Sequence, residues 1–168
     1  MTKAIPMFLA LLAAHWLGPG KTPPPSPFSL SITTPSTTIV SGVGIRIEIA
    51  LHNESRENVT MPMFYRPDEG EAHYKLTVAA RDGRPAPPTA YSRSLASSLT
   101  VAVCSAGCGS RIIPPRGSFR DQIIVTKLYD LTIPGVYILQ ISAQWGTLPR
   151  VASNQLRITV VPSGNWQR

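Results

Sequence analysis

The chain has few of the residues that carry catalysis. Its 168 residues include three histidines, two cysteines and nine carboxylates. It has no Gly-x-Ser-x-Gly nucleophile elbow, no His-Glu-x-x-His zinc signature and no paired Cys/His clusters. His15 lies in the apolar leader described below, so only His52 and His73 are left for chemistry. We therefore predict a protein that is not an enzyme and uses no cofactor.

The sequence also leaves little room for long helices. Seventeen prolines are scattered from residue 6 to residue 162. Proline lacks a backbone donor and clashes with the preceding turn, so it interrupts helix interiors. The length and the 43 % hydrophobic content are sufficient for one domain with its own core. Strands and loops are therefore expected to build that domain.

Negative charge is scarce, which gives a net charge of +7. Twelve of the sixteen basic residues are arginines, spread from residue 46 to residue 168. No basic run carries interleaved aromatic residues, and no zinc-finger or RNP-like pattern occurs. We expect an arginine-rich solvated surface, weakly attracted to polyanions, and no specific nucleic-acid partner.

Residues 1–20 have the anatomy of a secretory signal peptide. Lys3 supplies a positive start, and an apolar stretch follows over residues 5–17. That stretch is shorter than the roughly 20 apolar residues that cross a bilayer, so no transmembrane segment is expected after cleavage. Residues 21–27 read as a proline-rich linker. The pattern predicts a secreted or periplasmic protein and leaves the cleavage point open.

From residue 28 to residue 161 short runs alternate between apolar and polar side chains. The clearest run has its apolar members at Ile45, Ile47, Ile49 and Leu51. A period of two is typical of strands with one buried and one wet face. Seven to eight such runs, one of them over residues 99–103, predict an all-β, immunoglobulin-like antiparallel β-sandwich without a helix, followed by a flexible tail at 162–168.

The segment from Leu131 to Tyr137 reads Leu-Thr-Ile-Pro-Gly-Val-Tyr. It resembles the corner between the fifth and sixth strands of bacterial exported immunoglobulin-like domains. This resemblance implies that Tyr137 ties the corner back to the sandwich. The wider layout is similar to the immunoglobulin-like proteinase-inhibitor domain of bacilli, which adds inhibition of an extracellular protease as an alternative function. No inhibitory loop can be carried over from it.

Cys104 and Cys108 stand in the segment Cys-Ser-Ala-Gly-Cys-Gly. In an oxidising compartment two nearby thiols are expected to form a small-loop disulfide. The loop also resembles the binuclear copper loop of cytochrome oxidase subunit II, but Ile112 and Pro115 stand where that loop has histidine and methionine. A copper-handling or redox protein is therefore an alternative, and whether the two cysteines are bridged stays open.

Two further patterns have both a chemical and a structural interpretation. Met61 and Met63, with His52 or His73, offer soft ligands for Cu(I), although methionine in a strand usually fills gaps in a core. We therefore predict no metal site. Asn53 begins a glycosylation sequon, and asparagine is equally a natural turn residue.

Two proline-rich segments, Arg84 to Arg93 and Ile112 to Gly117, are long for hairpin loops. Binding residues concentrate on loops that a rigid scaffold holds in place. Tyr91, Arg93 and Arg116 are therefore the candidate binding residues. The sequence favours an exported, non-enzymatic domain that binds a protein or a cell-envelope polymer.

Overall fold

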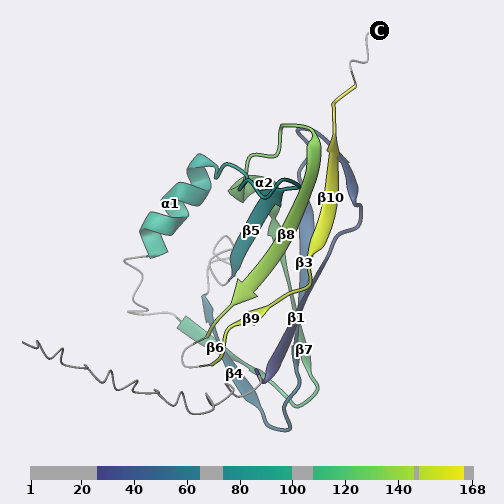
Figure 1. Ribbon diagram of the computed structural model, residues 1–168. Coiled ribbons are helices and arrows are strands. Elements are labelled where there is room, and N and C mark those ends of the chain that lie inside the picture. The colour runs from purple at the N-terminus through teal and green to yellow at the C-terminus, as the bar shows by residue number, and fades with distance from the viewer. Residues whose placement is uncertain (1–25, 65–73, 100–107, 146–147, 165–168) are drawn as a thin grey trace, which may run out of the picture.

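The computed structural model describes residues 26–64, 74–99, 108–145 and 148–164 (Figure 1). The strands are β1 (Phe28–Thr33), β2 (Thr38–Val40), β3 (Arg46–Asn53), β4 (Val59–Phe64), β5 (Lys75–Ala80), β6 (Cys108–Ile113), β7 (Ser118–Ile124), β8 (Gly135–Ala143), β9 (Val151–Ala152) and β10 (Leu156–Val161). The helices are α1 (Ala90–Leu99) and α2 (Val125–Leu128).

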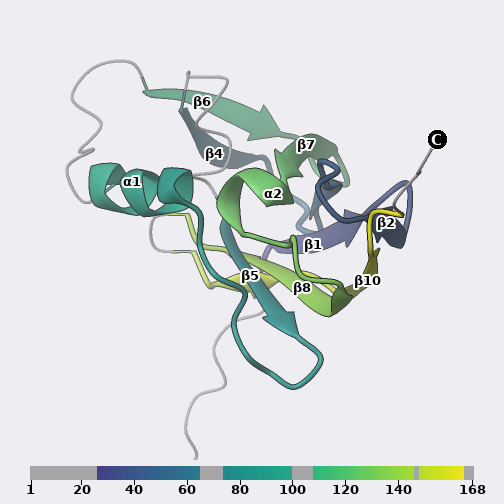
Figure 2. The same cartoon turned by 90° about the horizontal axis from the view of Figure 1, so that it is seen from above.

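The strands form two main sheets that face each other. One has the order β1-β3-β7, and the other has the order β2-β10-β8-β5 with β9 on β8. An immunoglobulin sandwich pairs its first, second and fifth strands in one sheet and its third, sixth and seventh in the other. The chain follows this order, which confirms the predicted antiparallel β-sandwich. Figure 2 shows the two sheets as two layers.

The structure has ten strands where the sequence predicted seven to eight. The short strands β2 and β9 and the strand β6 carry little alternation and were not predicted. β6 pairs with β4 in a separate two-stranded sheet. The Arg111 guanidinium of β6 lies 4.8 Å from the centre of the Phe119 ring of β7. The strands β4 and β6 therefore pack beside the β1-β3-β7 sheet.

The core lies between the two sheets. Ile47 of β3, Tyr137 of β8 and Ile158 of β10 are all buried in one hydrophobic cluster. Phe28 and Tyr74 pack edge-on against Trp145 at 5.4 and 6.4 Å between ring centroids, and they close one end of the cluster. The period of two in the sequence therefore places the apolar side chains in a shared interior, as expected.

The prediction that the domain contains no helix is wrong. The ten-residue α1 begins where Thr89 caps it, because the Thr89 hydroxyl accepts the backbone N–H of Ser92 at 3.1 Å. Leu99, predicted to begin a strand, ends this helix, and the other residues of that predicted strand lie outside the described residues. Among the described residues no helix has the length and hydrophobicity needed to cross a membrane.

In each main sheet, one outer strand has a residue whose backbone groups at the free edge are bonded by a side chain. Strand β2 pairs in parallel with β10, while the Ser36 hydroxyl bonds the N–H and C=O of Thr38 on its other edge. On the outer edge of β1, the Asn154 side-chain amide accepts the N–H of Ile32 at 2.9 Å and donates to its carbonyl at 3.1 Å. A side chain here takes the place of a neighbouring strand.

Candidate functional site

The predicted binding residues lie at opposite ends of the sandwich. Tyr91 and Arg93 are in the first turn of α1, not in a loop. Arg116 is in the turn between β6 and β7, where its φ of 59° is left-handed. The eight residues of β3 separate the two ends by about 25 Å, since a strand rises about 3.3 Å per residue. The three side chains therefore do not form one site.

At the upper end of Figure 1 the proline-rich segment before α1 is held against the chain that follows α2. The N–H of Thr89 donates to the carbonyl of Leu128 at 2.9 Å, and the N–H of Asp130 donates to the carbonyl of Pro87 at 2.8 Å. The Thr89 hydroxyl also donates to the carbonyl of Lys127. These bonds fix the position of the first turn of α1, and Leu95 in the next turn packs against the core.

The corner that leads into β8 is closed by side chains. The Tyr137 hydroxyl donates to the carbonyl of Ile133 at 2.8 Å, which is the bond of a tyrosine corner. The Asp130 carboxylate accepts the N–H of Thr132 at 3.0 Å and its hydroxyl at 2.7 Å. The Ser41 hydroxyl donates to the carbonyl of Thr132 at 2.6 Å, so the turn before β3 is joined to the same corner.

The segment before α1 and the corner before β8 line a cleft of about 600 Å³, which we call the corner cleft. Its lining residues are Gly42, Pro87, Pro88, Thr89, Ala90, Arg93, Thr126, Tyr129, Asp130, Leu131 and Thr132. Arg93 donates to the carbonyl of Pro88 at 2.6 Å, which holds its exposed guanidinium at the rim. Tyr91 is half-exposed and does not line the cleft.

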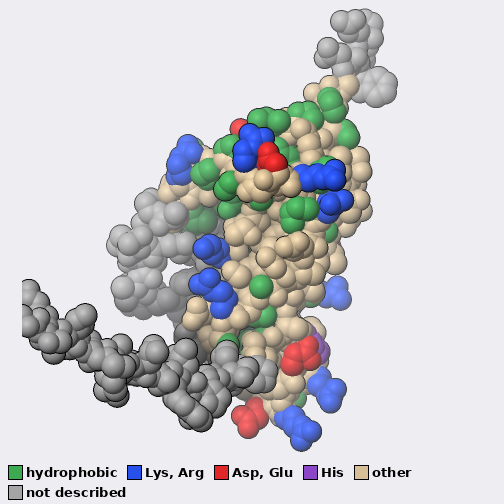
Figure 3. Space-filling view, viewed as in Figure 1, with side chains coloured by type: hydrophobic (Ala, Val, Ile, Leu, Met, Phe, Trp, Pro, Cys, Tyr) green, Lys and Arg blue, Asp and Glu red, His purple; other side chains and the backbone are tan. Residues whose placement is uncertain are grey.

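Apolar side chains are exposed at the same end. Ile133 is 70 % exposed and Val43 is 53 % exposed, next to the corner and to the turn that line the cleft. Figure 3 shows green side chains gathered at this upper end, whereas the blue basic side chains are scattered over the visible face. The cleft thus has one guanidinium in its lining, that of Arg93, and exposed aliphatic groups beside it.

The titratable groups of the corner stay in their ordinary ionisation states near neutral pH. The hydrogen bonds from the side chain and backbone of Thr132 lower the pKa of the Asp130 carboxyl. Burial raises the pKa of Tyr129 and of Tyr137, and the negative charge of Asp130 raises the pKa of Tyr137 further. The Tyr129 hydroxyl therefore stays protonated and donates to the carbonyl of Leu76 at 2.8 Å.

At the other end, the sequon residue Asn53 is fully buried. Its side-chain amide donates to the carbonyls of Glu57, Ile113 and Pro114 at 2.8 to 3.1 Å. Its side-chain oxygen accepts the N–H and the hydroxyl of Ser55. Asn53 therefore binds together two loops and is closed to glycosylation in the folded protein.

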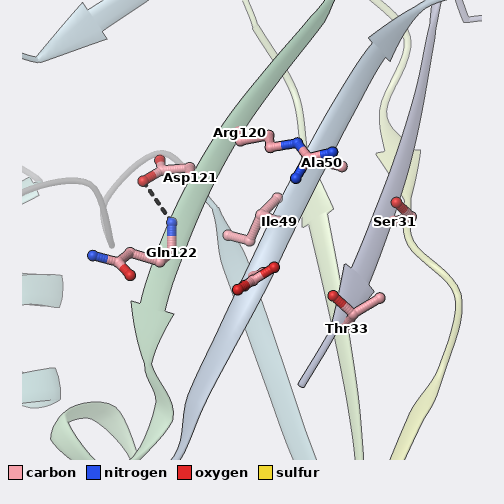
Figure 4. Close-up of a pocket in the computed structure, with 8 residues that line it drawn as sticks. Ser31, Thr33, Ile49, Ala50, Arg120, Asp121 and Gln122 are labelled. Carbon is pink, nitrogen blue, oxygen red and sulfur yellow. Dashed lines mark hydrogen bonds between the residues drawn. The ribbon is translucent and has the colours of Figure 1, made fainter. Parts of the chain in front are cut away.

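A second hollow, of about 570 Å³, lies on the outer face of the β1-β3-β7 sheet. Figure 4 shows Arg120 reaching from β7 towards Ala50 on β3, with Ser31 and Thr33 on the neighbouring strand β1. Glu48, Asp121 and Gln122 complete its polar lining. The alternation in the sequence indicated an exposed polar face here, but the strand register that brings these side chains together could not be read from it.

The predicted cysteine and methionine sites are only partly covered by the structure. Cys104, His73 and the side chains of Cys108 and Met63 lie outside the described residues, so the disulfide stays a prediction. Met61 is fully buried in the core. His52 contacts the Ser118 hydroxyl at 2.9 Å. Over the described part of the chain, no three His, Cys, Asp or Glu residues are grouped to hold a metal ion.

Sequence reasoning missed most of the corner cleft. It singled out Arg93 but not Asp130, Thr132 or the turn at Gly42. A signal for the cleft wall was present, since Asp130-Leu131-Thr132 has the spacing of an Asx turn. The contact between this corner and the segment before α1 joins residues about forty positions apart, which no local pattern reveals.

No protein-family model and no curated protein sequence matches the chain. Solved structures match weakly. The CARDB domain of the PF1109 protein from Pyrococcus furiosus is 9 % identical with a TM-score of 0.41, covering 80 % of this chain and 87 % of its own. The C-terminal domain of wzt is 11 % identical with a TM-score of 0.49, covering 86 % and 79 %.

The β-glucosidase from Listeria innocua in complex with isofagomine is 10 % identical with a TM-score of 0.44. The match covers 82 % of this chain but only 16 % of that enzyme. Such likenesses concern the arrangement of strands alone. The assignment of the fold rests on the strand order and on the tyrosine corner described above.

Proposed function

We propose that this chain is an exported, non-enzymatic immunoglobulin-like domain that binds a partner protein through the corner cleft. The proposal of export rests on the leader pattern of residues 1–20. The absence of catalysis is inferred from the scarcity of histidine and acidic residues across the sequence. The binding role rests on the geometry of the cleft.

The observation that carries the proposal is that the cleft is built before any partner arrives. Backbone bonds from Thr89 and Asp130 and the hydroxyl bond of Tyr137 hold its walls. A preorganised site loses less conformational entropy on binding. A volume of about 600 Å³ lies within the range of ligand pockets.

The chemistry of the rim favours a segment of a protein as the occupant. The exposed side chains of Ile133 and Val43 offer an apolar contact beside the cleft. The Arg93 guanidinium, which already donates to the Pro88 carbonyl, adds a positive charge at the rim that attracts a carboxylate. A chain segment with an acidic residue next to an aliphatic or aromatic one would meet both, and the net charge of +7 favours an acidic partner overall.

The proposal is tested by affinity capture from an envelope extract with four baits, namely the wild-type chain and three variants that each differ from it in one residue. A partner that uses the corner cleft is retained by the wild-type chain and by Arg116→Ala, and it is lost with Ile133→Asp and with Arg93→Ala. Retention by all baits, or loss with Arg116→Ala alone, contradicts the proposal. Amino-terminal sequencing of the exported chain tests removal of the leader.

Two alternative functions have their own tests. The copper or redox function requires free thiols at Cys104 and Cys108 together with stoichiometric copper, which thiol titration and metal analysis of the purified protein measure. The inhibitor function requires inhibition of at least one extracellular protease in a panel. Met61 is buried among core residues, so the structure favours a packing role for this proposed copper ligand.

A further inference from the structure

The outer face of the β1-β3-β7 sheet forms an ordered grid of polar side chains. The register places Ser31 of β1, Ala50 of β3 and Arg120 of β7 in one row. The next row holds Thr33, Glu48 and Gln122. Neighbouring strands are about 4.8 Å apart and alternate residues of one strand about 6.7 Å apart, so the six side chains share a patch of small dimensions.

The polar members of this patch have no partner within the described part of the protein. The side chains of Ser31, Thr33, Glu48, Arg120 and Gln122 make no hydrogen bond or ion pair there. Besides the backbone pairing of the sheet, the N–H of Gln122 donates to the carboxylate of Asp121 at 2.8 Å. The donors and acceptors of the patch are therefore available to a ligand in exchange for water.

The composition of the patch argues against two classes of partner. No aromatic side chain lines the hollow, and the methyl group of Ala50 is small, so the anchors typical of protein interfaces are lacking. The hollow is lined by two carboxylates, those of Glu48 and Asp121, and by the one guanidinium of Arg120, so a polyanion gains little at this face although the whole chain is basic. A neutral ligand that is rich in hydroxyl groups matches what remains.

We propose that this face binds a neutral polysaccharide. The Arg120 guanidinium donates to two neighbouring hydroxyls through its planar fork, and the Glu48 carboxylate accepts from another pair. Gln122, Ser31 and Thr33 add groups that both donate and accept. Ala50 leaves the room that a sugar ring requires between the two charged side chains.

Binding to one sugar unit is weak at such an open face, because no ring stacks on it and water competes for every hydrogen bond. A polymer offsets this by presenting many equivalent units, so that a released unit is replaced by its neighbour on the same chain. The face thus suits a long repeating chain better than a free monosaccharide.

The test is an NMR titration of the ¹⁵N-labelled chain with maltoheptaose, cellohexaose and chitohexaose, with an oligogalacturonate as an acidic comparison. We expect at least one neutral oligosaccharide to shift the amide signals of β1, β3 and β7 and to bind more tightly than its own monosaccharide. Glu48→Ala and Arg120→Ala are each expected to weaken binding at least tenfold. Arg157→Ala removes the same charge from the outer face of the other sheet and is expected to change the affinity less than twofold.

Three outcomes overturn the proposal: no neutral oligosaccharide shifts these signals, the oligogalacturonate alone binds, or Arg157→Ala weakens binding as much as Arg120→Ala. A circular dichroism spectrum and melting temperature of each variant show that it is folded. Ala50→Leu, which fills the hollow without removing a charge, serves as a second variant and is also expected to abolish binding. Since no residue of the corner cleft is altered, failure here leaves the protein-binding proposal to its own test.

Discussion

The two proline-rich segments of this domain look alike as sequences and do opposite things in the structure. The segment around Arg116 turns tightly and is bonded to the backbone of Asn53. The Arg116 N–H donates to the Asn53 carbonyl at 3.0 Å, and the Asn53 N–H donates to the Gly117 carbonyl at 2.9 Å. The segment before Arg93 is bonded first to β5, through Ala86 N–H to the Val78 carbonyl, and then to the chain after α2, through Thr89 N–H to the Leu128 carbonyl, and it forms one wall of an open cleft. One segment closes an end of the sandwich, and the other leaves an end open for binding.

The difference lies in where the hydrogen-bonding groups are directed. At the closed end a single buried amide takes up the free carbonyls of two loops, so few groups remain for a partner. At the open end the backbone bonds join the two walls of the cleft, the Arg93 guanidinium is bonded to the Pro88 carbonyl at the rim, and the Ile133 side chain is exposed. Under the proposed function, the segment before Arg93 can serve as a binding loop because hydrogen bonds within the protein already hold its backbone in place.

The largest effect is expected from Asn53→Ala, which removes the side-chain hydrogen bonds at the closed end. Removal of the amide leaves buried carbonyl groups without a donor, and we expect a loss of about 3 kcal/mol in the free energy of unfolding. Urea denaturation measures it. Asn58→Ala, five residues further and exposed, is the control and should change stability by less than about 0.5 kcal/mol. Equal losses would mean that Asn53 does not hold the closed end.

Arg93→Ala and Arg116→Ala compare the two segments directly. Loss of the rim guanidinium at the corner cleft is expected to weaken partner binding about tenfold, or about 1.4 kcal/mol, with an unchanged melting temperature. Arg116→Ala is expected to leave the affinity unchanged. Isothermal titration calorimetry with the captured partner measures both. If Arg116→Ala has the larger effect, the assignment of open and closed ends is reversed.

Tyr137→Phe removes the hydroxyl that closes the corner and keeps the buried ring. We expect a loss of about 1 kcal/mol, the usual net value of one hydrogen bond. Tyr129→Phe, which removes the bond to Leu76 on the wall of the cleft, is expected to cost a similar amount. Thermal melts of both variants measure the losses, and unchanged melts would show that these hydroxyl bonds do not stabilise the open end.

The smallest effect concerns pH. The bonds from Thr132 lower the pKa of Asp130 below its ordinary value of 3.8, so its ionised form favours the folded state. This stabilisation is present above the ordinary value and is lost as the pH falls through the lowered pKa in the folded protein. Wild type is therefore expected to melt above Asp130→Asn at pH 7, with the gap closing as the pH falls from about 5 to below the ordinary pKa of 3.8. A gap that stays constant over this range would exclude ionisation as its cause.

The sandwich could be predicted from the sequence because its evidence is local. Ile47, Ile49 and Leu51 alternate with polar residues, so one face of β3 must be buried, and Pro134-Gly135 marks the corner before Tyr137. Strand order followed from the fold class. The pairing of β1, β3 and β7 that creates the sheet-face hollow depends on register, which alternation does not specify.

The helix α1 was missed for a physical reason. Ten residues that include four serines have low intrinsic helix propensity, and the apolar positions are few. The start signal was nonetheless present, since two prolines precede a threonine that can cap a helix. Bonds from Thr89 and Asp130 to the opposite segment fix the first turn, and these long-range contacts are outside the reach of a local pattern.

The amide of Asn154 has a consequence beyond the stability of β1. A strand at the border of a sheet is a template onto which an unfolded or neighbouring polypeptide can zip, residue by residue. Because one side chain already occupies both backbone groups of Ile32, the last residues of β1 cannot accept a further strand while Asn154 stays in place. A polypeptide that pairs along this border has to displace the Asn154 amide first, which raises the free-energy cost of such pairing.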